Sequence, residues 1–167
     1  WRFHDEVAEK AQDDIKSQIK SKKDKELYKE FWSKLLPIIQ SKSTLFKNTK
    51  PSNKPYLGVN VGIRGISLGL HATKSKVRVN VYIDVGDKDE NETIFDKLSK
   101  SREQIEKDFG GGLNWERKDE VRHCRIQFEK DGNFQDKDSW DGMINLMTNK
   151  MVKLENAFGS PIAKLKD

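Results

Sequence analysis

The sequence predicts an α+β fold in which a five-stranded antiparallel sheet packs against amphipathic helices. Apolar residues recur about every four positions near both ends of the chain, which is typical of helices. Between those ends they alternate with polar residues in five short segments, which is typical of strands. The expected order of elements is α-α-β-β-β-α-β-β-α, and 167 residues, of which 34% are apolar, support one core of modest size.

Two helices are expected in the first forty residues. The first carries a narrow apolar stripe formed by Phe3, Val7, Ala11, Ile15 and Ile19. We expect this stripe to lie on the second helix, whose apolar face consists of Leu27, Phe31, Trp32, Leu35 and Ile39. Pro37 should kink or end that second helix. The chain is therefore divided into a lysine-rich N-terminal helix or linker, residues 1–26, and a single α+β domain, residues 27–167.

Three antiparallel strands should follow a loop over residues 40–55 that is rich in Ser, Asn and Pro. From Tyr56 the period changes from about four to two, and apolar residues alternate with polar ones over residues 57–63, 66–72 and 77–83. Each strand has one apolar and one polar face. We therefore expect helices to cover the sheet fully on one side only.

The remaining elements are a helix, two strands and a last helix. Asn91 is the expected N-cap of the helix, and the glycines at 110–112 should end it. The two strands are expected over residues 113–118 and 121–130, with Asp119 and Glu120 as their turn. The last helix has the clearest apolar stripe, made of Trp140, Met143, Ile144, Met147, Met151, Leu154 and Phe158.

The positive charge of the chain lies in its first third. Residues 1–54 carry 13 Lys and Arg against 8 Asp and Glu, whereas the remainder is balanced, so that part holds all of the net charge of +5. The lysine run consists of Lys16, Lys20, Lys22, Lys23, Lys25 and Lys29. Such a run can neutralise phosphates, although interleaved acids leave a solvated helix face as the alternative.

Several classes of protein and site are disfavoured. The single Cys124 cannot form an intramolecular disulfide, and neither a membrane-spanning run nor a signal peptide is evident, so a cytoplasmic protein is expected. Because the chain begins at Trp1, we interpret it as a piece of a larger protein. The cysteine and histidines have no zinc-ligand spacing, and the glycines match no phosphate-binding fingerprint, so no cofactor is expected.

Short motifs distributed along the chain carry a family resemblance. They are Phe31-Trp32, Gly65-Ile66, residues 79–83, Phe95-Asp96, residues 115–117, Arg125-Ile126, Ser139-Trp140 and residues 154–158. With these motifs the stretch from Tyr28 to Leu165 resembles the uncharacterised prokaryotic family catalogued as domain of unknown function 4268. The resemblance implies a domain that often lies at the carboxyl end of proteins with a nuclease-like domain, in restriction or defence settings. It implies no active-site residues.

The polar face of the predicted sheet is the strongest candidate for a site. Alternation gathers cationic, amide and aromatic side chains there: Asn60, Ser67, His71, Arg78, Asn80 and Tyr82, with Arg125 and Gln127 as possible additions. An open sheet with Tyr and Arg can stack bases and contact phosphates, whereas a second helix layer would leave these groups to pair internally. The expected function is a non-catalytic module that binds nucleic acid or a partner domain. The expected contact residues are Lys20, Lys22, Lys23, Arg64, His71, Arg78, Tyr82 and Arg125.

Two alternatives remain open. Asp84, Glu116 and Lys118 have the spacing of a PD-(D/E)xK nuclease, in which two carboxylates bind Mg²⁺ and the lysine orients the attacking water. The other alternative is a purely structural role, with the lysine-rich first helix as a linker or homodimerisation element.

Overall fold

A computed structural model describes residues 2–118 and 120–166, with the side chains of residues 2–9 and 11 left out. It contains α1 (Arg2–Gln40), β1 (Tyr56–Asn60), β2 (Ile66–Ala72), β3 (Lys76–Ile83), α2 (Lys88–Ser99), α3 (Arg102–Phe109), β4 (Asn114–Glu116), β5 (Cys124–Asp131), a 3₁₀ turn (Lys137–Ser139) and α4 (Trp140–Lys164). The strands form one antiparallel sheet in the order β1-β2-β3-β5-β4. The predicted α+β class and antiparallel sheet are confirmed.

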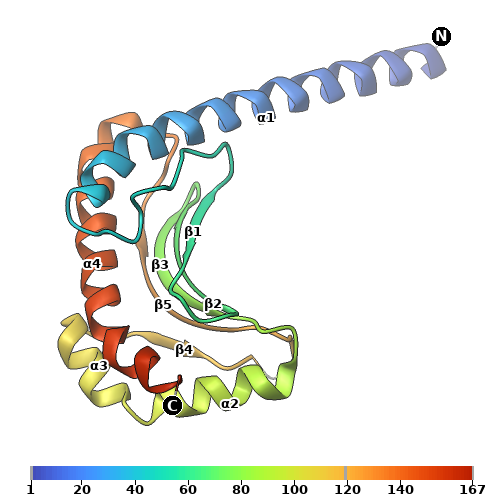
Figure 1. Ribbon diagram of the computed structural model, residues 1–167. Helices are drawn as coiled ribbons and strands as arrows, with labels where there is room; N and C mark the ends of the chain where they lie inside the picture. Colours follow the sequence, from blue (N-terminus) through green and yellow to red (C-terminus); the bar gives the residue numbers. More distant parts are fainter. Residues whose placement is uncertain (1, 119, 167) are drawn as a thin grey trace.

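The beginning of the chain is one continuous helix rather than two. The expected break falls where the apolar stripe stops, but the residues there are mostly Lys, Glu and Asp, and neither Gly nor Pro interrupts the helix before Pro37. The N-terminal part of α1 projects away from the sheet (Figure 1), and Ile15 and Ile19 are each 56% exposed. The expectation that the first stripe packs on the second helix is therefore wrong for these two residues. The side chains of Phe3, Val7 and Ala11 lie outside the described residues.

The helix expected after β3 is divided into α2 and α3. Asp87 is the N-cap of α2, and its carboxylate accepts a hydrogen bond of 3.0 Å from the backbone amide of Glu90. Asn91, the predicted cap, instead lies buried in the first turn of α2. Its side-chain oxygen accepts a hydrogen bond of 2.7 Å from the backbone amide of Val85. The predicted glycine end is confirmed, because Gly110 caps α3 in the left-handed conformation at φ 91°.

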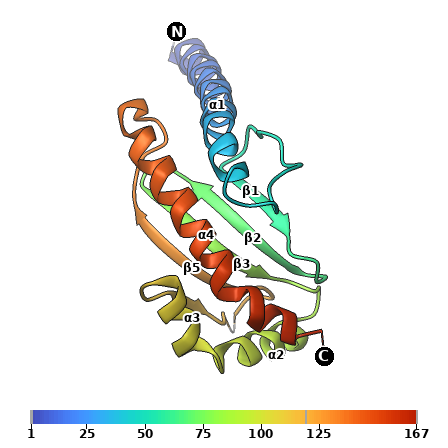
Figure 2. The same cartoon turned by 60° about the vertical axis from the view of Figure 1, so that its left-hand side comes forward.

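Helix α4 covers one face of the sheet. It lies against β2 and β3 and runs roughly along the strands (Figure 2), and its Met147, Met151 and Leu154 are buried. Facing side chains from the middle strands, such as Val79 and Ile126, are also at most 1% exposed. Every such side chain removed from water contributes roughly 1.5–3 kcal/mol to folding. This face is therefore the hydrophobic core.

The C-terminal part of α1 joins the core at one end of the sheet. Phe31 contacts Trp140 of α4 edge to face, with ring centroids 5.3 Å apart. The Trp32 indole N–H donates a hydrogen bond of 2.8 Å to the carbonyl of Lys54, which precedes β1. These contacts hold α1 beside the start of β1 and the turn between β2 and β3.

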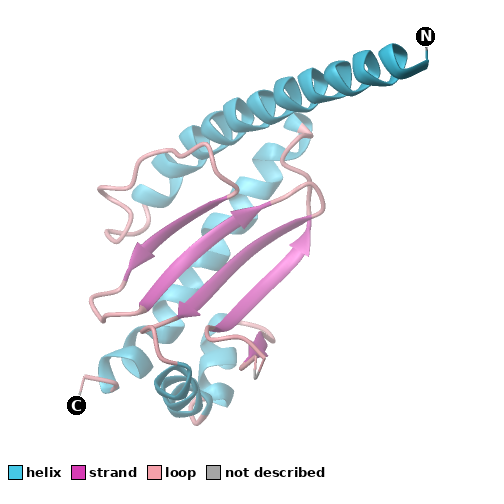
Figure 3. Ribbon diagram, turned by 90° about the vertical axis from the view of Figure 1, so that its right-hand side faces the viewer, coloured by secondary structure: helices cyan, strands magenta, loops and turns pink. Residues whose placement is uncertain are grey.

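The opposite face of the sheet is open. None of the described helices crosses it (Figure 3), so the expected one-sided covering is confirmed. The β4–β5 strands are shorter than predicted, and Asp119 of their expected turn lies outside the described residues. Among the described residues, no helix combines the length and apolarity needed to cross a bilayer.

Two glycines in the turn between β1 and β2 allow a test of how this turn packs against the segment that follows β3. Gly65 has φ +84°, and a Cβ there would overlap the Val85 side chain and lie 2.8 Å from its Cα. Gly62 has φ +86°, but of the described residues a Cβ there would meet only Lys166, at 3.9 Å from its Nζ. Gly62→Ala should cost about 1 kcal/mol for the left-handed backbone. Gly65→Ala should cost about 2–4 kcal/mol, because overlap is added to the same backbone penalty. Urea denaturation of both variants measures this, and equal losses would contradict the described contact.

Candidate nucleic-acid interface

Three rows of side chains cross the open face. Strand register aligns a central row made of Gly58, Gly69, Asn80, Gln127 and Asn114. On the side toward α1 runs a row made of Tyr56, His71, Arg78 and Glu129. On the side toward α2 runs a row made of Asn60, Ser67, Tyr82, Arg125 and Glu116. The face predicted from alternation is thus assembled in one layer.

The open face is hollowed where the two glycines meet. Gly58 and Gly69 are direct partners across β1 and β2, so no side chain rises between the two flanking rows there. The resulting cavity, called the open-face hollow below, has a volume of about 420 Å³. Its lining consists of Tyr56, Leu57, Gly58, Ser67, Gly69, His71, Asn80 and Tyr82.

Aromatic rings and an imidazole flank the open-face hollow. Tyr56 is 47% exposed, and its ring centroid is 5.9 Å from that of His71. Tyr82 rests on His123, with the ring centroids 5.0 Å apart. Burial, followed by the positive charges of Arg78 and Arg125, lowers the pKa of His71 to about 4. His71 is therefore neutral at pH 7 and can both donate and accept a hydrogen bond.

Buried amides without partners lie in the central row. Asn80 is 1% exposed, and within the described part of the chain neither its Oδ1 nor its Nδ2 has a hydrogen-bond partner. Gln127, its neighbour on β5, is 4% exposed, and its Oε1 also lacks a partner there. A buried polar group without a partner costs about 1–3 kcal/mol. This cost makes Asn80 and Gln127 unusual for residues with a purely structural role.

Two of the three predicted arginines, Arg78 and Arg125, are paired inside the sheet. Arg78 Nε is 2.7 Å from Glu129 Oε2, and Arg125 Nε is 3.1 Å from Glu116 Oε2. Each pair joins neighbouring strands within one row. Their charges therefore largely cancel, and the open face itself has little net positive charge.

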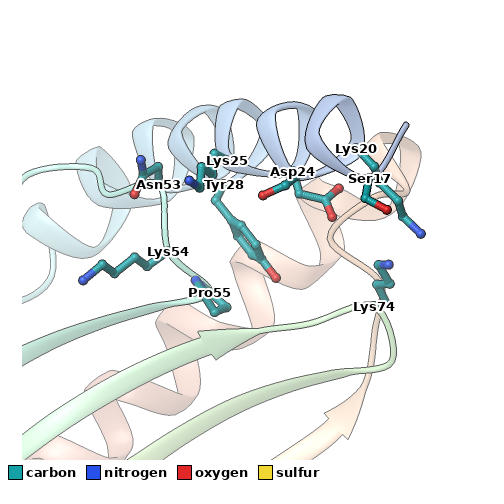
Figure 4. A pocket seen from close by; sticks show the side chains of 10 residues that line it. Ser17, Lys20, Asp24, Lys25, Tyr28, Asn53, Lys54, Pro55 and Lys74 are labelled. Carbon is teal, nitrogen blue, oxygen red and sulfur yellow. The ribbon is translucent and has the colours of Figure 1, made fainter. Parts of the chain in front are cut away.

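Lysines gather instead beneath α1, next to the open face. A cleft of about 610 Å³ lies between α1, the loop that precedes β1 and the turn that joins β2 to β3 (Figure 4). Four lysines line this lysine cleft: Lys20, Lys25, Lys54 and Lys74, with Asp24 as the acidic residue in its lining. The Lys20 side chain contacts Lys74, and this contact with its like charge lowers the pKa of Lys74. Two neighbouring ammonium groups attract an anion, and the carboxylate of Asp24 partly offsets their charge.

The lysine cleft and the open-face hollow meet at β1. Lys54 lines the cleft and Tyr56 lines the hollow, and the Lys54 Nζ is 5.9 Å from the Tyr56 ring centroid. His71 of the hollow and Lys74 of the cleft are likewise close in sequence, on either side of the end of β2. One extended ligand could therefore occupy both.

The remaining predicted contact residues are dispersed. Lys22 and Lys23 are exposed on α1 but do not line the lysine cleft. Arg64 is exposed in the β1–β2 turn, at the other end of β2 from Lys74. The sequence interpretation did not name Tyr56, Lys54 and Lys74, which line these two cavities. Only knowledge of which strand positions face each other could have assigned them to one site.

The residues of the nuclease alternative are engaged in ion pairs. Asp84 Oδ2 accepts a hydrogen bond of 2.7 Å from Arg122 Nη2, which lowers the pKa of the carboxyl. Glu116 is bound to Arg125, and Lys118 Nζ lies 3.9 Å from Glu116 Oε2. Among the side chains that the structure describes, no three from His, Cys, Asp or Glu gather in a group that could hold a metal ion.

Comparison with known proteins identifies a family but no function. The model of a family described as Domain of unknown function (DUF4268) matches residues 27–162, which confirms the resemblance noted in the sequence. Neither a curated protein nor a solved structure matches the chain.

The low pKa of His71 predicts how stability depends on pH. In the unfolded chain His71 takes up a proton near pH 6.5, whereas in the folded protein it stays neutral down to about pH 4. The unfolded state therefore binds more protons between these values, and stability present above pH 6.5 should be lost as the pH falls toward 4. His71→Gln should lose less stability over this range. Thermal melts of both proteins from pH 7.5 to 4 measure the difference, and parallel curves would contradict the burial of His71.

Proposed function

Since this chain belongs to the DUF4268 family, for which no function is described, we propose its function from its own surface: it is a module that binds single-stranded nucleic acid. The observation that carries the proposal is the junction of the lysine cleft with the open-face hollow at Lys54 and Tyr56. The backbone of the strand would follow the lysines, and its bases would turn toward the sheet.

The chemistry of the two cavities favours an unpaired strand. Proteins that bind single strands combine a cationic groove for the phosphates with aromatic side chains on which bases stack. The lysine cleft supplies the first, and Tyr56 and Tyr82 supply the second. In a duplex the faces of the bases are covered by their neighbours, so a duplex could use the lysines but not the tyrosines. Single strands should therefore bind more tightly than duplexes of the same length.

Two ways of coupling this binding surface to cleavage of nucleic acid differ in which domain cuts. In the setting that the family resemblance implies, the module would hold nucleic acid for an adjacent nuclease-like domain. Cleavage by this chain itself would require the Asp84, Glu116 and Lys118 alternative with Mg²⁺. Titrations with and without Mg²⁺ that also score cleavage separate a binding module from that enzyme.

Self-association through α1 is a second candidate function. Ile15 and Ile19 lie on the projecting part of α1 and are each more than half exposed. An apolar stripe of this kind is stabilised when a second helix covers it. Sedimentation equilibrium of the chain and of Ile15→Ser/Ile19→Ser tests this: a doubled mass that reverts to the monomer mass in the variant would support dimerisation.

Charge removal in the lysine cleft tests the nucleic-acid proposal. Lys20→Ala/Lys74→Ala should weaken the binding of a 12-nucleotide single strand. It should also make the slope of log K against log salt concentration shallower by about 1.4, or about 0.7 per lost phosphate contact. Lys22→Ala/Lys23→Ala removes the same charge from the same end of the protein but not from the cleft, and should leave the slope nearly unchanged. Fluorescence anisotropy at several salt concentrations measures both. No salt-sensitive binding by the unmodified protein would overturn the proposal, and equal losses in the two variants would refute a specific role for the cleft.

A further inference from the structure

We propose that the open-face hollow receives one unpaired nucleobase of the bound strand and that the Asn80 side-chain amide hydrogen-bonds its edge. This inference rests on the proposed function, since it assumes that a strand is bound. It goes further by assigning a base site to residues other than the lysines.

The glycine pair gives the hollow the size of a small-molecule site. Its volume of about 420 Å³ falls in the range of about 300–1,000 Å³ that is usual for such sites. The space exists because Gly58 and Gly69 face each other, and larger residues on the two strands would fill it. A Cβ on Gly69 would lie 2.7 Å from Asn80 Oδ1, so the Asn80 amide lies directly beside this glycine.

The Asn80 amide has the chemistry to recognise a base edge. An asparagine side chain offers a donor and an acceptor side by side, which matches the paired groups on the edges of nucleobases. Neither the oxygen nor the nitrogen of the Asn80 amide has a hydrogen-bond partner within the described residues, although Asn80 is only 1% exposed. A bound base would supply the missing hydrogen bonds. Because the amide has almost no exposed surface, a side chain at the rim must turn aside when the base enters.

The walls of the hollow suit the faces and the sugar of a nucleotide. Tyr56 and Tyr82 lie at diagonally opposite corners, on β1 and β3 and in different rows, so a base between them can stack on either ring. The neutral His71 and the Ser67 hydroxyl add hydrogen-bonding groups without adding charge. The phosphate of the same nucleotide can then reach Lys54, whose Nζ lies over the Tyr56 ring at 5.9 Å from its centroid.

The first experiment compares strands with and without bases. The probes are fluorescein-labelled dT12, dA12 and dC12 and an abasic 12-mer with the same number of phosphates. The unmodified protein should bind at least one of the three base-containing strands roughly tenfold more tightly than the abasic strand, because base stacking and edge contacts are then available. A matching set of RNA strands shows whether the 2′-hydroxyl changes the result.

The second experiment uses two variants of the hollow. Asn80→Leu keeps the approximate size of the side chain but removes the amide, so it should reduce the preference for strands with bases to what stacking on Tyr56 and Tyr82 provides. It should also raise the melting temperature by about 2–4 °C, because two buried polar groups without partners disappear. A residue with only a structural role would instead lower the melting temperature when replaced.

Gly58→Val tests the space independently of the amide. Among the described residues outside the adjacent chain positions, a Cβ at this position would come within 4 Å of the Leu68 carbonyl oxygen alone, at 3.7 Å, so the variant should fold. It should lose the base preference while keeping salt-dependent binding. Asn60→Val is the matched control, because Asn60 lies on the same face of β1 but does not line the hollow.

The outcomes separate this inference from the proposed function. Equal affinity for the abasic strand and for every strand with bases would overturn the base site and leave the proposed function standing. Unchanged base preference in both Asn80→Leu and Gly58→Val would also overturn it. Absence of salt-sensitive binding to all strands would overturn the proposed function itself.

Discussion

Burial of one face of the sheet under α4 and the end of α1 is the constraint on which the rest of the structure depends. The apolar positions of the strands, such as Val79 and Ile126, all turn toward this layer. Since side chains alternate along a strand, the same register places the polar positions together on the other face. Packing of the core therefore also fixes the positions of the side chains on the open face, although no described helix packs on that face.

Charge is divided between the two parts of the candidate interface. Inside the rows the arginines are matched by glutamates on neighbouring strands, as for Arg78 with Glu129. Beneath α1 the lysines outnumber the acids, and Lys20 and Lys74 lie together. Attraction of an anion would thus come from the edge of the sheet, whereas discrimination among ligands would come from the nearly neutral hollow. The strength of electrostatic attraction and the specificity of recognition would thus come from different parts of the interface.

The fold class followed from the sequence because alternation and helical periodicity are local properties of the chain. Local patterns gave the wrong prediction for α1, where Lys, Glu and Asp continue the helix without contributing to an apolar stripe. They were also wrong for Asn91, whose side chain bonds to Val85 after β3 and to Arg122 before β5 and does not cap a helix. The polar face was predictable, but the hollow was not. That Gly58 faces Gly69, and that Arg78 meets a glutamate 51 residues away, depends on strand pairing, which a single sequence does not specify.

The continuity of α1 has a mechanical consequence. Its 39 residues make a rod about 58 Å long. Sharp bends in helices arise mainly at proline, glycine or inserted groups, and Pro37 lies within the last turn of the rod, beside the core. The projecting part is therefore a lever arm whose pivot lies at Phe31 and Trp32. A sideways force on the arm would act as a torque about this pivot and would move the helix segment that carries Lys20 and Lys25, so the width of the lysine cleft would change with it.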